Sequence, residues 1–159
     1  MRIAIGADHN GLAVKALLIE GLRSAGHEID DRGGYAGPDG TIDYPPLCYD
    51  VGTRVVDGRA DRGIIVGGSG SGEHIACNKI RGVRAGLGHD RFTAQISRAH
   101  NDANVLVIGA KVVGPHQAEA IVEMWLGTAF KGGVHQRRLD QIAAIERGEP
   151  PVLPTVTEQ

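Results

Sequence analysis

Ile64-Ile65-Val66-Gly67-Gly68-Ser69-Gly70-Ser71-Gly72-Glu73 joins an apolar run to a segment with a helical pattern. The three apolar residues predict a buried strand, and the segment from Glu73 to Lys79 predicts a helix. The four glycines between them let the backbone turn sharply and expose its N–H groups. A loop of this kind at the start of a helix is a ready anion site. Because Glu73 places a carboxylate in that same loop, the stretch indicates chemistry as well as binding.

The same alternation of short apolar runs and longer helical patterns extends along the chain in both directions. Strands are predicted at residues 3–6, 27–31, 63–66, 83–87 and 105–108. Helices are predicted at residues 8–25, 45–57, 73–79, 89–99, around 118–125 and at 135–147. This order predicts an α/β fold with a five-stranded parallel sheet and helices on both of its faces. Ligands of such sheets bind beyond the carboxyl ends of the strands, where Asp8-His9, the 67–73 loop and Lys111 are expected.

Length and composition narrow the class of protein. The 159 residues fit a single domain, and residues 149–159, with three prolines, predict an irregular tail. A net charge of −2 gives no reason to expect a nucleic-acid or membrane partner. Cys48 and Cys77 lack the spacing of a metal site, so we interpret them as buried free thiols in a reducing compartment. Without a signal peptide or a membrane-length apolar run, the chain is expected in the cytoplasm.

The 67–73 loop allows two interpretations. It does not end in G-K-[ST], so it is not a P-loop, and it is a poor dinucleotide fingerprint. It is either a tight turn without a ligand or a cradle of N–H donors for a developing oxyanion. Glu73 is correspondingly either a helix-capping acid or a base that abstracts a proton next to a carbonyl.

Other candidate groups each have a plain structural alternative. Asp8 is a helix N-cap or a site residue, and His9, expected in the first helical turn, can contact a sugar hydroxyl or a phosphate. Tyr44 either packs over a ligand or is structural. His100-Asn101 should lie at the opposite end of the sheet, as a surface helix terminus, unless a second subunit uses it. Arg137-Arg138 is a solvated helix face or a phosphate clamp.

Seven motifs in order carry a resemblance to a known family. They are Gly-Ala-Asp-His-Asn-Gly (6–11), Asp-Tyr-Pro (43–45), Gly-Ser-Gly-Ser-Gly-Glu (68–73), Asn-Lys (78–79), Gly-Val-Arg-Ala (82–85), His-Asn-Asp-Ala (100–103) and His-Gln-Arg-Arg (135–138). The chain resembles the ribose-5-phosphate isomerase B family, which includes allose-6-phosphate and galactose-6-phosphate isomerases. The resemblance covers residues 1–148, interpreted as one sugar-phosphate isomerase domain. It implies a Rossmann-like three-layer sandwich, a homodimer with shared active sites, and no metal or organic cofactor. The sequence leaves open whether two dimers assemble into a tetramer.

The resemblance also implies a role for each candidate residue. The family has two base arrangements, one with a cysteine at the position of Gly67 and one with a glutamate at Glu73. This chain resembles the second, actinobacterial-like type, so Glu73 is expected to move the proton between C1 and C2 of a cis-enediolate. The remaining implied roles concern groups that contact the substrate. Ser69 and the amides around Gly68, Gly70 and Gly72 hold the enediolate oxygens, His100 helped by Asp8 opens the sugar ring, Asn101 and Tyr44 contact the sugar, and His9 and Arg138 contact the phosphate.

Two positions depart from the family pattern. Family arginines correspond to Lys111 and Val134 here, and lysine lacks the planar fork of arginine. Either Arg137 compensates, or the preferred substrate is not ribose 5-phosphate. We expect conversion of ribose 5-phosphate to ribulose 5-phosphate, with a tetrose, another pentose or a hexose phosphate as the alternative. A non-catalytic phosphate- or nucleotide-binding module of flavodoxin-like shape is the rival from another class.

Overall fold

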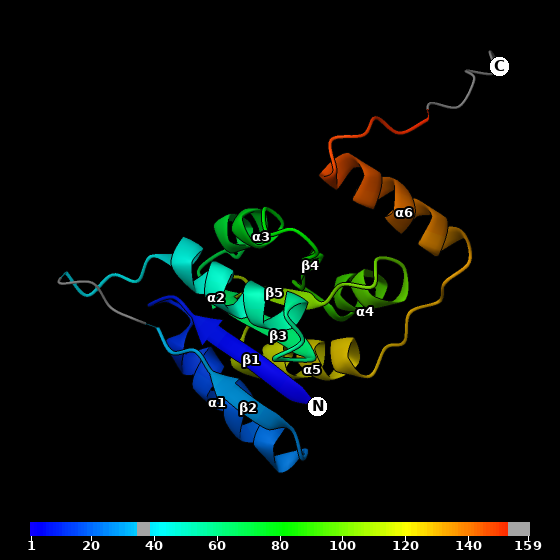
Figure 1. The fold of residues 1–159 in the computed structure, drawn as a ribbon. Coiled ribbons are helices and arrows are strands. Elements are labelled where there is room, and N and C mark those ends of the chain that lie inside the picture. Colours follow the sequence, from blue (N-terminus) through cyan, green and yellow to red (C-terminus); the bar gives the residue numbers. More distant parts are fainter. Residues whose placement is uncertain (35–38, 153–159) are drawn as a thin grey trace.

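The computed structural model describes residues 1–34 and 39–152, and a five-stranded sheet lies at its centre (Figure 1). The strands are β1 (Arg2–Ala7), β2 (Glu28–Asp31), β3 (Arg62–Gly67), β4 (Ala85–Leu87) and β5 (Val105–Gly109). Their order is β2-β1-β3-β5-β4, and every neighbouring pair is parallel. The helices are α1 (Leu12–Ser24), α2 (Tyr44–Val56), α3 (Ser71–Cys77), α4 (Arg91–Ala99), α5 (Pro115–Leu126) and α6 (Val134–Glu146). The predicted α/β fold with a five-stranded parallel sheet is confirmed.

Two apolar clusters, one on each face of the sheet, make the three layers. Ile64 and Ile65 are successive residues of β3, so their side chains point to opposite faces. Ile64 packs in the cluster formed with α1, α4 and α5, where Trp125 is fully buried. Ile65 packs in the cluster formed with α2 and α3, where Val51 is fully buried. Burial on both faces explains why the central strands are continuous apolar runs.

The register of the sheet brings the loops after β1, β3 and β5 to one edge. Ala7 pairs with Val66, and Gly67 pairs with Gly109, so these three strands end side by side. The amide of Asp8 donates to the carbonyl of Val66 over 3.0 Å. The amides of Ala110 and Lys111 donate to the Gly67 and Gly68 carbonyls over 2.8 and 2.9 Å. This carboxyl edge therefore holds three of the segments that the sequence singles out.

The start of α1 differs from the prediction. Its N-cap is Gly11, and the helix begins at Leu12, four residues later than expected. Asp8 Oδ1 accepts hydrogen bonds from the amides of Asn10 and Gly11 over 2.8 and 3.1 Å, which closes a turn ahead of the helix. The placement of His9 in the first helical turn is therefore wrong, as is the alternative that Asp8 is the helix N-cap.

Strand β4 and helix α4 also begin later than predicted, so both are shorter than expected. Val83 donates its amide to the Ile80 carbonyl in a turn, so β4 begins at Ala85. Asp90 forms a capping box with Thr93, so α4 begins at Arg91 and leaves residue 89 outside the helix.

Helix α6 stands apart from the layers that cover the sheet (Figure 1). A groove of about 880 Å³ is lined by α6 together with β4, α4 and the end of α3. Several apolar side chains that line this groove are exposed to solvent, including Phe92 at 69% and Ile145 at 58%. Residues 149–152 form no helix or strand, and the rest of the predicted tail, 153–159, lies outside the described residues.

Candidate active site

The glycine loop after β3 is shaped by its backbone. Gly70 has φ +81°, in the left-handed region that favours glycine, and a Cβ there would lie 2.9 Å from Leu87 Cδ1. Within residues 1–34 and 39–152, the amides of Gly68, Ser69 and Gly70 have no acceptor within hydrogen-bond distance. Ser69 Oγ accepts from the amide of Ser71 over 3.2 Å. The loop therefore presents several free N–H donors just ahead of α3, as the sequence predicts.

Glu73 lies in the first turn of α3 and is buried, with 4% of its surface exposed. Its carboxylate occupies the space beside Gly67, where any added Cβ would overlap it. In the same first turn of α3, a Cβ at Gly72 would lie 2.6 Å from Tyr44 Oη. The absence of side chains at residues 67 and 72 thus makes room for one carboxylate and one phenol at the same edge.

The surroundings of Glu73 favour the protonated carboxyl group more than water would. Burial, followed by the negative charge of Asp8, raises the pKa of Glu73 above the ordinary glutamate value. A higher pKa makes the ionised carboxylate a stronger proton acceptor, which suits a base at near-neutral pH. The arrangement can therefore remove a proton from a substrate and hold the resulting oxyanion.

Asp8 stands next to the glycine loop and is 5% exposed. Its Oδ2 accepts a hydrogen bond from Asn10 Nδ2 over 2.9 Å, and that amide would lie 3.2 Å from a Cβ at Gly68. Asn10 therefore connects the two loops, although its residue type and spacing give no signal of this role. His9 is exposed on the same turn, where its Nδ1 accepts from the amide of Ile42 over 3.4 Å. Lys111 is exposed beyond β5.

His100 and Asn101 lie at the other end of the sheet. The Gly63 amide, near the start of β3, donates to Asn104 over 3.0 Å, and Arg84 Nε, ahead of β4, donates to the Asn101 carbonyl over 3.1 Å. The six residues of β3 span about 20 Å between the two edges. One chain therefore does not bring His100 to its own Glu73.

His100 has a partner that the sequence did not indicate. Its ring stacks on that of His135, at the start of α6, with centroids 3.8 Å apart and planes inclined by 11°. Desolvation, and then the charges of His100, Arg138 and Lys131, lower the pKa of His135. Arg137 and Arg138 are exposed on the same helix, so a basic group gathers beside His100. The predicted residues thus form two clusters at opposite edges of the sheet.

Asp102 holds the loop that carries His100 and Asn101. Its φ of +44° is the one positive value for a non-glycine among the described residues. Its carboxylate accepts from Arg84 Nη2 over 2.8 Å and from Arg98 Nη1 over 2.7 Å. Strained conformations of this kind persist where the surroundings hold them, often at functional sites.

The two cysteines are buried and free, as predicted. Cys48 Sγ lies 3.7 Å from the Glu73 carbonyl. Its hydrogen bond with Cys77, and then burial, raise the pKa of the Cys48 thiol far above its usual range. Both observations fit thiols that pack behind the site.

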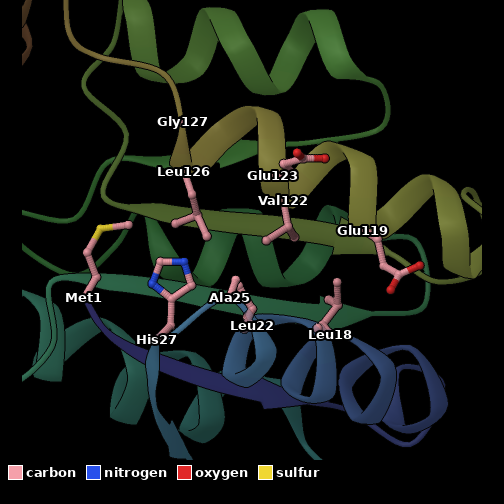
Figure 2. A pocket seen from close by; sticks show the side chains of 11 residues that line it. Met1, Leu18, Leu22, Ala25, His27, Glu119, Val122, Glu123, Leu126 and Gly127 are labelled. Atoms are coloured by element: carbon pink, nitrogen blue, oxygen red, sulfur yellow. The ribbon is translucent and has the colours of Figure 1, made fainter.

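A separate pocket of about 420 Å³ lies between α1 and α5 (Figure 2). Its walls are largely apolar, with Glu119 and Glu123 from α5, and it contains none of the predicted site residues. Over the described ranges, no group of three or more His, Cys, Asp or Glu side chains could hold a metal ion. None of the helices described is long and apolar enough to cross a membrane.

Known proteins resemble this chain over nearly its whole length. A family model described as Ribose/Galactose Isomerase matches residues 3–142. Ribose-5-phosphate isomerase B of Escherichia coli is 41% identical over 146 residues, which cover 92% of this chain and 97% of that protein. A solved ribose-5-phosphate isomerase B of Clostridium thermocellum has a TM-score of 0.89 and 40% identity, over 93% of this chain and 99% of that one. The corresponding Mycoplasma genitalium structure, with bound ribulose 5-phosphate, has a TM-score of 0.85 and 35% identity, over 92% and 96%.

Proposed function

Because this chain belongs to the ribose/galactose isomerase family, we propose that it interconverts ribose 5-phosphate and ribulose 5-phosphate. Its relatives named ribose-5-phosphate isomerase B support this reaction, including one solved with ribulose 5-phosphate bound. The observation that carries the proposal is the buried Glu73 carboxylate, of raised pKa, beside free amides at the end of a parallel strand. This arrangement suits proton transfer through an enediolate.

In the proposed mechanism, ionised Glu73 removes the proton from C2 of the open-chain aldose. The electron pair of the broken C–H bond forms the C1=C2 double bond, and the aldehyde oxygen becomes the enediolate oxyanion. The amides of Gly68 and Gly70, with Ser69, hold the enediolate oxygens. Glu73 then returns the proton to C1. The C2 hydroxyl proton moves to the O1 oxyanion as the C2 ketone forms, so the product carries a C1 hydroxyl.

The ring-opening step requires a second copy of the chain. His100 is the proposed ring-opening acid–base group, and it lies at the edge of the sheet opposite to Glu73 of its own chain. The open groove between α6 and the β4–α4 surface exposes apolar side chains suited to a partner protein. We therefore propose a homodimer in which each chain supplies His100, Asn101 and Arg138 to its partner's Glu73. We also propose a cytoplasmic location, which the two free thiols support.

The test replaces the base with its neutral isostere. In the Glu73→Gln variant, kcat should fall by about 10³-fold or more, because the amide cannot accept the C2 proton. Incubation in deuterium oxide should label C1 of ribulose 5-phosphate with wild type and not with the variant. The matched control is Glu123→Gln, an exposed glutamate of α5, which should behave as wild type. Near-normal turnover by Glu73→Gln would show that Glu73 is not the base.

A second candidate keeps this chemistry and changes the sugar. Lys111 lies at the carboxyl edge and Val134 begins α6, where the resemblance expects arginines. A charge-assisted hydrogen bond is worth about 1.5–3 kcal/mol, so its loss can weaken phosphate binding tenfold or more. Values of kcat/KM for tetrose, pentose and hexose phosphates decide between the substrates. A clear preference for ribose 5-phosphate would eliminate this candidate.

A further inference from the structure

His89 makes a contact with the glycine loop that none of the predicted roles includes. It lies between β4 and α4, and its Nε2 is 3.0 Å from the carbonyl oxygen of Ser69. A carbonyl only accepts hydrogen bonds, so this contact requires a hydrogen on Nε2 of His89. The side chain of His89 thus donates into the loop from the side of β4.

The backbone around His89 is anchored on both sides. The preceding amide, of Gly88, donates to the Val107 carbonyl of β5 over 2.8 Å. The following residue, Asp90, forms the capping box of α4 with Thr93. These two anchors fix the backbone of His89, so its side chain reaches Ser69 from a fixed position.

The Ser69 carbonyl is confined by a second neighbour. A Cβ added at Gly109 would lie 2.5 Å from this oxygen, so the missing side chain at residue 109 leaves room for it. The peptide between Ser69 and Gly70 is planar and trans, so its N–H points away from its carbonyl. Holding the Ser69 oxygen against β5 and His89 therefore aims the Gly70 N–H in the opposite direction. Within the described residues that N–H has no acceptor.

We infer that His89 is a positioning residue of the oxyanion hole. By holding the Ser69 carbonyl, it orients and polarises the Gly70 N–H, which stabilises the enediolate oxygen. This role rests on the proposed isomerase function. A donor fixed before the reaction acts mainly where charge develops, so its loss lowers kcat and leaves KM nearly unchanged.

A pair of substitutions of similar length separates hydrogen bonding from packing. His89→Met removes the donor, and His89→Gln keeps one. We expect kcat for ribose 5-phosphate to fall about tenfold in His89→Met and to stay within about threefold of wild type in His89→Gln. KM should change less than twofold in both. Affinity for a phosphorylated hydroxamate, a planar mimic of the enediolate, should fall in parallel with kcat. The control is His116→Met, a histidine whose side chain is 97% exposed on α5.

Equal kcat values for His89→Met and His89→Gln, or a loss confined to KM, would overturn the role of His89. If wild type itself does not convert ribose 5-phosphate, the proposed function fails instead. The Gly70 amide then provides an independent readout by NMR, because its chemical shift should move in His89→Met and return toward wild type in His89→Gln. An unchanged Gly70 shift in both variants would also overturn the inference.

Discussion

The Glu73 carboxylate occupies the space that a side chain on Gly67 would fill. The resemblance names two alternative bases, a thiol at residue 67 or a carboxylate at residue 73, and the geometry explains why they exclude each other. Any Cβ at residue 67 displaces the carboxylate from its position beside the free amides. Space, as well as chemistry, therefore separates the two base arrangements that the resemblance implies.

The first prediction tests this steric relation with Gly67→Ala. The added methyl group should displace the Glu73 carboxylate from its position beside residue 67. We expect kcat to fall about 100-fold, since small misplacements of a catalytic group have effects of that size. Steady-state kinetics with ribose 5-phosphate measures the change. The control is Gly114→Ala, because a Cβ at that residue meets open space. If Gly67→Ala retains kcat within threefold, Glu73 does not need this position.

The second prediction concerns the pH profile. Glu73 must be ionised to accept a proton, so kcat/KM should fall as the pH drops through its pKa, which burial and then the charge of Asp8 raise. In Asp8→Asn the charge is lost while one oxygen acceptor remains, so the pKa of Glu73 should decrease. The acid limb of the profile should therefore move to lower pH. Ribulose 5-phosphate, which is acyclic, is the substrate of choice because it bypasses ring opening. A limb that stays or moves to higher pH would contradict the coupling between the two carboxylates.

At the scale of the elements, the sequence predicted strands and helices well and their starts poorly. Apolar runs such as Ile64-Ile65-Val66 record burial on both faces of a sheet, which is a property of the whole fold. The start of a helix depends instead on which backbone amides donate to the side chain ahead of it. Asp90 caps its helix through Thr93, whereas Asp8 closes a turn ahead of α1. Both are aspartates ahead of helical patterns, so the sequence alone does not separate the two cases.

The third prediction tests the loop between α4 and β5. Asp102 combines a positive φ with ion pairs to Arg84 and Arg98, at 2.8 and 2.7 Å. Asp102→Ala should lower the free energy of unfolding by about 3 kcal/mol, because it loses charged hydrogen bonds and puts alanine in the left-handed region. Asp102→Asn should lose only about 1 kcal/mol, since asparagine tolerates that conformation and still accepts a hydrogen bond. Urea unfolding measures both. Equal losses would mean that backbone conformation contributes nothing here.

At the scale of the whole molecule, the candidate residues divide between two edges of one sheet. The carboxyl-edge cluster around Glu73 was predictable, because parallel sheets bind ligands at that edge. The sequence also placed His100 at the opposite edge, but the stack of His100 on His135 was not predictable. That contact depends on where α6 lies relative to the sandwich, which no local pattern records.

The fourth prediction follows from this division and uses two inactive variants. Glu73→Gln lacks the proposed base, and His100→Asn lacks the proposed ring-opening group. If each site combines Glu73 of one chain with His100 of the other, a mixed dimer contains one site with both groups and one with neither. Unfolding and refolding a 1:1 mixture should make half of the dimers mixed, and so restore about a quarter of wild-type activity on ribose 5-phosphate.

The control for this experiment is the same mixture without unfolding, which should stay inactive for as long as the chains do not exchange. A double variant carrying both substitutions, refolded with wild type, tests the reverse arrangement. Each of its mixed dimers has two sites that lack one group, so refolding should leave only the activity of the wild-type homodimers. If the two single variants restore nothing after refolding while both form dimers, each chain must complete its own site, and the sharing of His100 between subunits is wrong.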